Sequence, residues 1–148
     1  MDMSFYMPTD VRTGRGCLLA GGGALSRLGA RCLVVTGKTS ARASGALDDL
    51  ATVLSGAGVG YTVFDGIGQN PTYAACLAAA EVAKEIGAEF IVGIGGGSPL
   101  DAAKAVAVLA ACRDTSAEAL FSCKWDAAPL PIVAIGTYSL RGRTEMSV

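Results

Sequence analysis

Three consecutive glycines followed by a serine are the residues with the clearest capacity for chemistry. They occupy positions 95–98 of the segment IVGIGGGSPLDAAK, which covers residues 91–104. The segment begins with a β-branched run typical of a buried strand and ends with a helix-forming sequence. Glycines in such a turn let a ligand approach the backbone, and the N–H groups of the first helical turn have no partner within the helix. The pattern is therefore suited to binding a phosphate.

Two interpretations of this glycine turn are open. The glycines serve only close packing between strand and helix, or they cradle the diphosphate of a nucleotide cofactor. We favour the cradle, because three glycines in a row exceed what packing requires. The sequence of this turn matches neither the G-x-G-x-x-G dinucleotide fingerprint nor the lysine-bearing P-loop motif, so neither of those sites is predicted.

The helix expected after the glycines has a well-specified start. Ser98 can serve as its N-cap, Pro99 fits the first helical position, and Asp101 can reach back to the cap or hold a cofactor group. The backbone N–H groups of Gly96, Gly97 and Ser98 would then face the diphosphate.

The end of the strand predicted over residues 31–36 bears on which nucleotide binds. An acidic side chain there would hold the 2′-hydroxyl of the adenine ribose and repel a 2′-phosphate. The sequence instead has Gly37 followed by Lys38. A small residue beside a cation makes room for a phosphate and attracts its charge, so NADP is favoured over NAD. The alternative, in which Lys38 is only a solvated residue and NAD binds as well, stays open.

Alternating strand and helix signals supply the elements that would position these residues. Strands are predicted over residues 31–36, 59–64, 90–94 and 131–135, and helices over residues 44–55, 71–86 and 99–112. This alternation indicates a Rossmann-like α/β fold with a parallel sheet and helices on both faces. We expect one dinucleotide-binding domain over residues 1–148.

In such sheets, the ligand lies beyond the carboxyl ends of the strands, where the strand order reverses. The stretches that follow predicted strands are Gly37 and residues 65–70, 95–98 and 136–138. Asn70, in the second of these stretches, can also cap the helix whose first position would be Pro71.

The other segments carry weaker signals. Residues 5–12 are compatible with an extended edge segment interrupted by Pro8, and residues 17–28 with a short helix weakened by a second glycine triplet. We interpret that triplet as a flexible or closely packed surface feature. Residues 113–128 predict a short helix and a loop, with Trp125 as a packing anchor rather than a residue that stacks on a ligand.

Composition and charge exclude several classes of protein. The 148 residues are 51% hydrophobic and 17% charged, which is ample for one buried core. A formal net charge of −1 gives no basic field for nucleic acid, and no basic run would hold a membrane surface. The first residues do not read as a signal peptide, and no apolar run approaches the ~18 residues of a membrane span. We expect a cytoplasmic protein whose partners are small molecules.

Five cysteines are widely spaced and form no C-x-x-C pair. They are Cys17, Cys32, Cys76, Cys112 and Cys123. We interpret them as small buried hydrophobes in a reducing compartment rather than as metal ligands or redox centres.

The sequence GGGSPLDAAK at residues 95–104 resembles the signature of the iron-containing (group III) alcohol dehydrogenases. Further motifs occur in the family's order at residues 5–8, 33–38 (LVVTGK), 64–67 (FDGI), 70–72 (NPT) and 129–135 (PLPIVAI). The resemblance covers nearly all of the chain up to Ile135. It implies reversible hydride transfer between NAD(P) and a small alcohol or aldehyde, whose oxygen is held by a divalent metal, iron or zinc.

The resemblance also implies roles for single residues. The diphosphate would lie on Gly96, Gly97 and Ser98, the cofactor groove would be lined by Asn70 and Thr137, and the adenine ribose would lie at Gly37. In the family, a glycine at the position of Gly37 is associated with tolerance of NADP. Tyr138 stands beside Thr137 and is a further candidate cofactor contact, although it is much bulkier than the family's residue.

Two departures from the family pattern set limits on this reading. The family's metal ligands are one aspartate and three histidines in a following helical domain, whereas this sequence has no histidine. We therefore assign no metal ligand and no catalytic residue, and expect only the N-terminal nucleotide-binding part, without the C-terminal all-helical metal domain. The glycine-rich loop that follows Ile135 in the family is also replaced, so residues 136–148 are a divergent or incomplete end.

Three functions remain open. The first is a truncated or split oxidoreductase that binds cofactor but does not turn over alone, completed by a missing helical domain or a second chain. The second is a relative of glycerol dehydrogenase or dehydroquinate synthase, which the absence of a lysine after the triplet disfavours. The third is a noncatalytic interaction module that keeps the fold and has lost the cofactor. An uncovered apolar surface would favour self-association, so a homodimer is also open.

Overall fold

The computed structural model describes residues 3–4, 8–138 and 143–147, and over these residues six strands form one sheet in the order β1-β6-β5-β4-β2-β3. The strands are β1 (Val11–Thr13), β2 (Arg31–Thr36), β3 (Gly60–Phe64), β4 (Phe90–Gly95), β5 (Ile132–Tyr138) and β6 (Arg143–Ser147). The neighbours among β3, β2, β4 and β5 pair in parallel, whereas β6 and β1 extend the sheet in antiparallel pairing. The predicted parallel sheet is confirmed, and the antiparallel extension adds to it.

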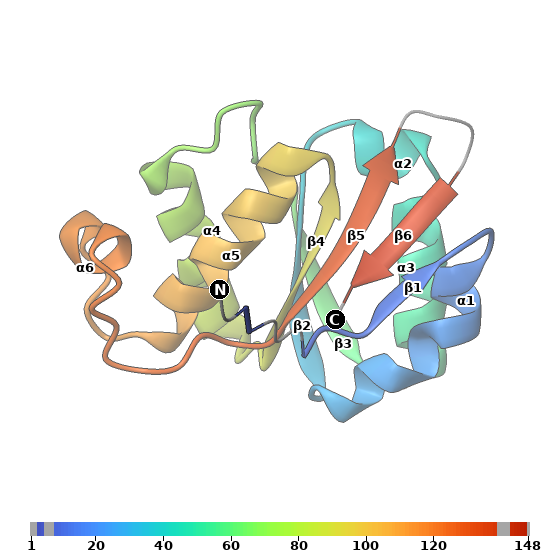
Figure 1. Ribbon diagram of the computed structural model, residues 1–148, viewed down its shortest axis with the longest axis horizontal. Helices are drawn as coiled ribbons and strands as arrows, with labels where there is room; N and C mark the ends of the chain where they lie inside the picture. The colour runs from blue at the N-terminus through green and yellow to red at the C-terminus, as the bar shows by residue number, and fades with distance from the viewer. Residues whose placement is uncertain (1–2, 5–7, 139–142, 148) are drawn as a thin grey trace.

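Helices cover both faces of this sheet (Figure 1). They are α1 (Cys17–Gly21), the 3₁₀ helix η1 (Gly22–Arg27), α2 (Ser40–Ala43), α3 (Ala46–Gly56), α4 (Tyr73–Ile86), α5 (Gly97–Ala111) and α6 (Ala117–Phe121). Helices α4 and α5 lie on one face, and α1, α2 and α3 lie on the other (Figure 1). The expected Rossmann-like arrangement with helices on both faces is therefore present.

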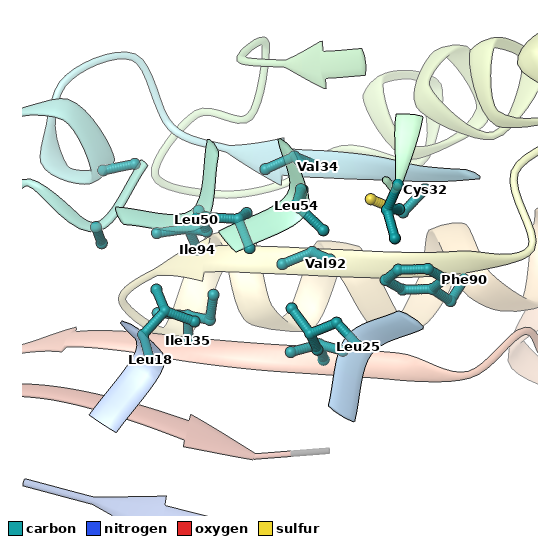
Figure 2. Packing of buried hydrophobic residues seen from close by; sticks show 14 residues of the cluster. Leu18, Leu25, Cys32, Val34, Leu50, Leu54, Phe90, Val92, Ile94 and Ile135 are labelled. Carbon is teal, nitrogen blue, oxygen red and sulfur yellow. The ribbon is translucent and has the colours of Figure 1, made fainter. Parts of the chain in front are cut away.

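Each face of the sheet has its own apolar core. On the α3 side, Leu18, Leu25, Leu50 and Leu54 pack against β2, β4 and β5. Figure 2 shows Leu18 beside Ile135 and Leu50 beside Ile94. On the other face, most of the buried residues that α4 and α5 contribute to the core are alanines, which allow the helices to approach the strands closely. All six residues of β4 are buried, because the strand is covered on both sides.

The boundaries of α4 illustrate how local sequence sets an element. Its N-cap is Thr72, whose hydroxyl accepts from Ala75 N at 3.1 Å, so the predicted cap at Asn70 is wrong. Thr72 has the extended backbone that an N-cap residue requires. The predicted stop at Gly87 is confirmed, since this residue adopts a φ of 67° as a left-handed C-cap.

Other segments differ in part from the expectations. Strand β5 continues to Tyr138 instead of ending at Ile135, because β6 pairs with its last residues. Residues 17–28 form α1 and η1 rather than one helix. At Gly22, an added Cβ would lie 2.1 Å from Val53 Cγ1, so this part of the second glycine triplet serves close packing.

The expectations for the segments with weaker signals agree with the structure only in part. The edge segment expected over residues 5–12 corresponds in part to the edge strand β1, whereas residues 5–7 lie outside the described residues. Trp125, expected as a packing anchor, is 40% exposed, and its indole N–H donates to the Leu120 carbonyl. Cys123 is exposed, unlike the buried Cys32, Cys76 and Cys112. Within the described chain, no helix is long and apolar enough to cross a membrane.

Candidate functional site

The strand order reverses between β2 and β4. From β2 the chain runs to β3 on one side, and then crosses back over β2 to reach β4 on its other side. Ligands of open parallel sheets bind beyond the carboxyl ends of the strands at such a reversal. Thr36 pairs with Ile94 at these ends, so the turns that begin at Gly37 and Gly96 leave the sheet side by side.

A cavity of about 510 Å³ lies at this position. It is lined by three segments that are distant in sequence, namely residues 37–40, 66–69 and 96–99. Its size falls within the range of about 300–1,000 Å³ that is usual for small-molecule sites. The predicted stretches after three of the strands therefore meet around one hollow.

The glycines of the turn after β4 differ in what lies in front of them. Gly95 has a φ of 141°, and a Cβ added to it would lie 2.8 Å from the Pro99 side chain, so Gly95 shapes the turn itself. A Cβ added to Gly96 or Gly97 would meet no atom within 4 Å among the described residues. Both residues line the cavity, so packing does not account for the absence of their side chains.

Helix α5 begins two residues earlier than its sequence suggests. Gly96 is the N-cap residue and Gly97 the first helical residue, so the prediction that Ser98 caps the helix with Pro99 in first position is wrong. The Ser98 hydroxyl instead donates to the Gln69 carbonyl on the opposite wall of the cavity. Pro99 is tolerated at the third position because the first-turn N–H groups need no helical acceptor.

The amino end of α5 gives the cavity its electrostatic character. The helix has 15 residues, and the N–H groups of Gly97 and Ser98 belong to its first turn. Unpaired N–H groups at a helix N-terminus carry partial positive charge and favour an anion. Of the described residues that line the cavity, Lys38 is the cation and none is a carboxylate. The site is thus suited to a negatively charged ligand.

Asp101 does not line the cavity. Its carboxylate pairs with the Lys104 ammonium at 3.2 Å, and both side chains are 69% exposed. The expectation that Asp101 reaches back to cap the helix is therefore wrong. It lies one turn beyond the cavity, where an ion pair between residues three apart supports the helix only weakly.

The predicted site residues fall into two groups. Gly37, Gly96, Gly97 and Ser98 line the cavity together. Asn70 is exposed and follows Gln69 of the cavity wall, without lining the cavity itself. The remaining two candidates lie at the end of β5.

Thr137 follows the Gly136 that pairs with Gly95, so it stands at the same edge of the sheet as the glycine turn. Its Oγ1 is buried and has no hydrogen-bond partner among the described residues. Tyr138 pairs through its backbone with Arg143, and its side chain lies outside the described part of the structure.

Sequence reasoning missed some residues of the cavity. Thr39 and Ser40 add two hydroxyls beside Lys38, and Gln69 forms part of the opposite wall. A polar run after the strand was the available signal for the hydroxyls. Gln69 lies within the stretch expected over residues 65–70, but its contact with Ser98 depends on tertiary structure that no local pattern contains.

The described residues do not fit a metal ion. They contain no group of three or more His, Cys, Asp or Glu side chains that could hold one. The sequence has no histidine, which is the usual nitrogen ligand of iron and zinc in proteins. The buried thiols do not compensate, since burial raises the pKa of Cys32 to about 12 and keeps it protonated.

Comparisons with known proteins agree on one family. The family model described as iron-containing alcohol dehydrogenase matches residues 8–144. The long-chain primary alcohol dehydrogenase AdhA of Thermoanaerobacter ethanolicus is 43% identical over 104 residues, which is 70% of this chain and 26% of the relative. The NADPH-dependent butanol dehydrogenase of Clostridium saccharobutylicum is 31% identical over 105 residues, again 70% of this chain and 26% of the relative.

A solved structure extends this similarity to three dimensions. The crystal structure of an iron-containing alcohol dehydrogenase from Thermotoga maritima superposes with a TM-score of 0.86 at 43% sequence identity. The match covers 90% of this chain and 37% of the crystallised one. The chain thus spans between a quarter and two fifths of the length of these relatives.

Proposed function

The chain belongs to the iron-containing alcohol dehydrogenase family, and on that premise we propose that it forms the NAD(P)-binding portion of such an enzyme. The reaction of the complete enzyme would be reversible hydride transfer between NAD(P) and a small alcohol or aldehyde. The observation that carries the proposal is the cavity at the strand reversal, with Gly96 and Gly97 facing open space at the amino end of α5.

The diphosphate would lie against the glycine turn. Gly96, Gly97 and Ser98 would donate their backbone N–H groups to its oxygens, and the partial positive charge of α5 would favour its negative charge. A side chain at position 96 or 97 would project into the space that the diphosphate occupies. This requirement accounts for glycines at positions where packing imposes none.

The adenosine end would lie at the end of β2. Gly37 leaves room beside the ribose, and Lys38, Thr39 and Ser40 offer a cation and two hydroxyls to a 2′-phosphate. A carboxylate, which would bind the 2′-hydroxyl and repel a 2′-phosphate, is absent from the described lining. Butanol dehydrogenases dependent on NADH and on NADPH both occur among the relatives. The lining favours NADP in this chain.

The nicotinamide end would extend toward Asn70 and β5. When bound, the nicotinamide supplies the hydride-transfer chemistry of the cofactor. The buried Thr137 hydroxyl, without a partner among the described residues, would gain one from a polar group of the cofactor. The backbone of Tyr138 continues the same strand end, where we propose a further contact.

The metal-dependent half of the reaction is not assigned to this chain. The described residues hold no metal-binding group and the sequence has no histidine, so no step of substrate activation is derived from them. What the described residues can do is bind and orient the nucleotide. We propose that the chain alone binds cofactor without turning over an alcohol.

Calorimetric titration in metal-free buffer tests this function. The 148-residue chain is titrated with NADPH and separately with NADH, together with Gly97→Val and Gly23→Val variants. Neither glycine has a described atom within 4 Å of an added Cβ, but only Gly97 lines the cavity. We expect saturable binding, tighter for NADPH, that is lost in Gly97→Val and kept in Gly23→Val. A folded chain that binds neither nucleotide would contradict the proposal and support a noncatalytic interaction module.

A further inference from the structure

The wall of the cavity opposite the glycine turn is a segment between β3 and α4, residues 65–72, which we call the strap. It is the green loop that joins β3 to α4 in Figure 1. Its central residue Ile67 is only 3% exposed and packs into the core beside α4 and α5. The neighbouring Gly66, Gly68 and Gln69 are exposed and line the cavity. Ile67 thus anchors the strap, and the residues around it form the wall.

Two hydrogen bonds tie the strap to the two other walls of the cavity. The Ile67 N–H donates to the Thr36 carbonyl at the end of β2, at 3.4 Å. The Ser98 hydroxyl donates to the Gln69 carbonyl from the first turn of α5. The first bond is between backbone groups and does not depend on side-chain identity, whereas the second depends on the Ser98 hydroxyl.

The hydroxyl and the backbone N–H of Ser98 therefore have different binding partners. A serine hydroxyl has one proton to donate, and here that proton is on the Gln69 carbonyl. Phosphate oxygens at neutral pH are predominantly acceptors, so this hydroxyl cannot serve a diphosphate while it holds the strap. The backbone N–H of Ser98, in the first helical turn, stays available to an anion.

We propose that Ser98 is a positioning residue whose hydroxyl holds the strap across the cavity and so sets the width of the nucleotide site. This inference rests on the proposed function, because it gives the strap a nucleotide to enclose. Without the hydroxyl, the hydrogen bonds of the described residues would hold the strap only at Ile67 and at the start of α4. The wall would then open more often, and part of the binding free energy would be used to order it.

The test compares Ser98→Ala and Ser98→Thr with the unaltered 148-residue chain. Threonine keeps the hydroxyl and should restore what alanine removes. Ser26→Ala is the matched control, because the Ser26 hydroxyl also donates to a main-chain carbonyl, that of Gly23 at 2.9 Å, in η1. Two quantities are measured: amide hydrogen exchange of the strap without nucleotide, and the Kd for NADPH by calorimetry.

We expect Ser98→Ala to speed exchange in the strap and to raise the Kd about three- to tenfold, as loss of one hydrogen bond implies. Ser98→Thr should restore both values, and Ser26→Ala should change neither. Unchanged strap exchange and unchanged Kd in Ser98→Ala would overturn the inference, as would a weakened site that threonine does not restore.

The two levels of the argument fail in different ways. If the unaltered chain binds neither NADPH nor NADH, the proposed function fails, and the role of Ser98 toward a nucleotide fails with it. If the unaltered chain binds NADPH and Ser98→Ala binds it equally well, only the positioning role fails. Exchange in the absence of nucleotide reports on the strap in either case.

Discussion

At the scale of single residues, glycine occurs in β4 and the turn after it for two different structural reasons. An added Cβ at Gly93 would lie 2.8 Å from Ala103 Cβ, so this glycine permits the close approach of α5 to the sheet. Gly96 and Gly97 have open space in front of them. Glycine thus serves close packing at position 93 and, in our proposal, ligand access at positions 96 and 97.

The packing role of Gly93 predicts a larger loss of stability there than at a glycine with open space in front of it, such as Gly23. Gly93→Ala should lower the free energy of unfolding by about 1–3 kcal/mol, because the new methyl group overpacks the strand–helix contact. Gly23→Ala, whose Cβ would meet no described atom within 4 Å, should change it by no more than about 0.5 kcal/mol. Urea denaturation measures both. Equal stability of the two variants would contradict the packing role of Gly93.

The cysteines also differ from one another, in how far their thiols are buried. Burial raises the pKa of the Cys32 thiol to about 12, whereas Cys123 is exposed. Thiolates are the reactive form, so iodoacetamide at pH 8 should label Cys123 and leave Cys32 unlabelled in the folded chain. Peptide mass spectrometry separates the two sites, with the urea-unfolded chain as control. Native labelling of Cys32 as fast as that of Cys123 would show that Cys32 is not buried.

At the scale of elements, the connection from α5 to β5 is organised by a carboxylate. Asp126 accepts the backbone N–H groups of Arg113 and Asp114, at 3.0–3.1 Å, and Asp114 accepts that of Ser116 at 3.0 Å. These bonds hold the pKa of Asp126 and that of Asp114 below the usual value of 3.8. They favour the charged forms, so they stabilise the folded connection only while the carboxylates are ionised.

The lowered pKa values of Asp114 and Asp126 determine how the stability depends on pH. Because the folded-state pKa values are lowered, the contribution is complete above pH 3.8 and is lost as the pH falls through the folded values. Asp126→Asn should therefore lower the melting temperature at pH 7, and the difference from the unaltered chain should narrow below pH 3.8. Thermal melts at several pH values measure this. A difference that grows as the pH falls would contradict the assignment.

The sequence predicts element types better than element starts. The buried strand predicted over residues 90–94, which extends to Gly95, and the helix stop at Gly87 follow from β-branched runs and a left-handed glycine, both of which act locally. The start of α5 could not be predicted in the same way, because the Ser98 side chain bonds to Gln69, 29 residues away. Strand β6 was missed because RTEMS lacks a hydrophobic pattern and depends on pairing with β5 and β1.

At the scale of the whole molecule, the candidate site is a product of topology. Residues 37–40, 66–69 and 96–99 meet because the chain reverses its strand order between β2 and β4. The glycine turn and Gly37 could be proposed from local patterns and family resemblance. Residues 65–70 and Thr137 could be expected at this edge as well. The hydrogen bond between Ser98 and Gln69, and the buried Thr137 Oγ1 without a partner among the described residues, depend on the assembled sheet.

The whole chain also sets the limits of its chemistry. It spans 37% of the crystallised Thermotoga maritima relative, and its described residues offer an anion site without a metal-binding group. Nucleotide binding and metal chemistry are therefore separable in our account. The central claim is that the amino end of α5 and its glycine turn receive the diphosphate.

The most direct test of that claim is titration of the ¹⁵N-labelled chain with NADPH, followed residue by residue in amide NMR spectra. We predict that the amides of Gly96, Gly97 and Ser98 shift most and saturate together with those of residues 37–40, while the amides of η1 stay unchanged. Saturable shifts confined to another part of the molecule, or none at all in a folded chain, would contradict the account.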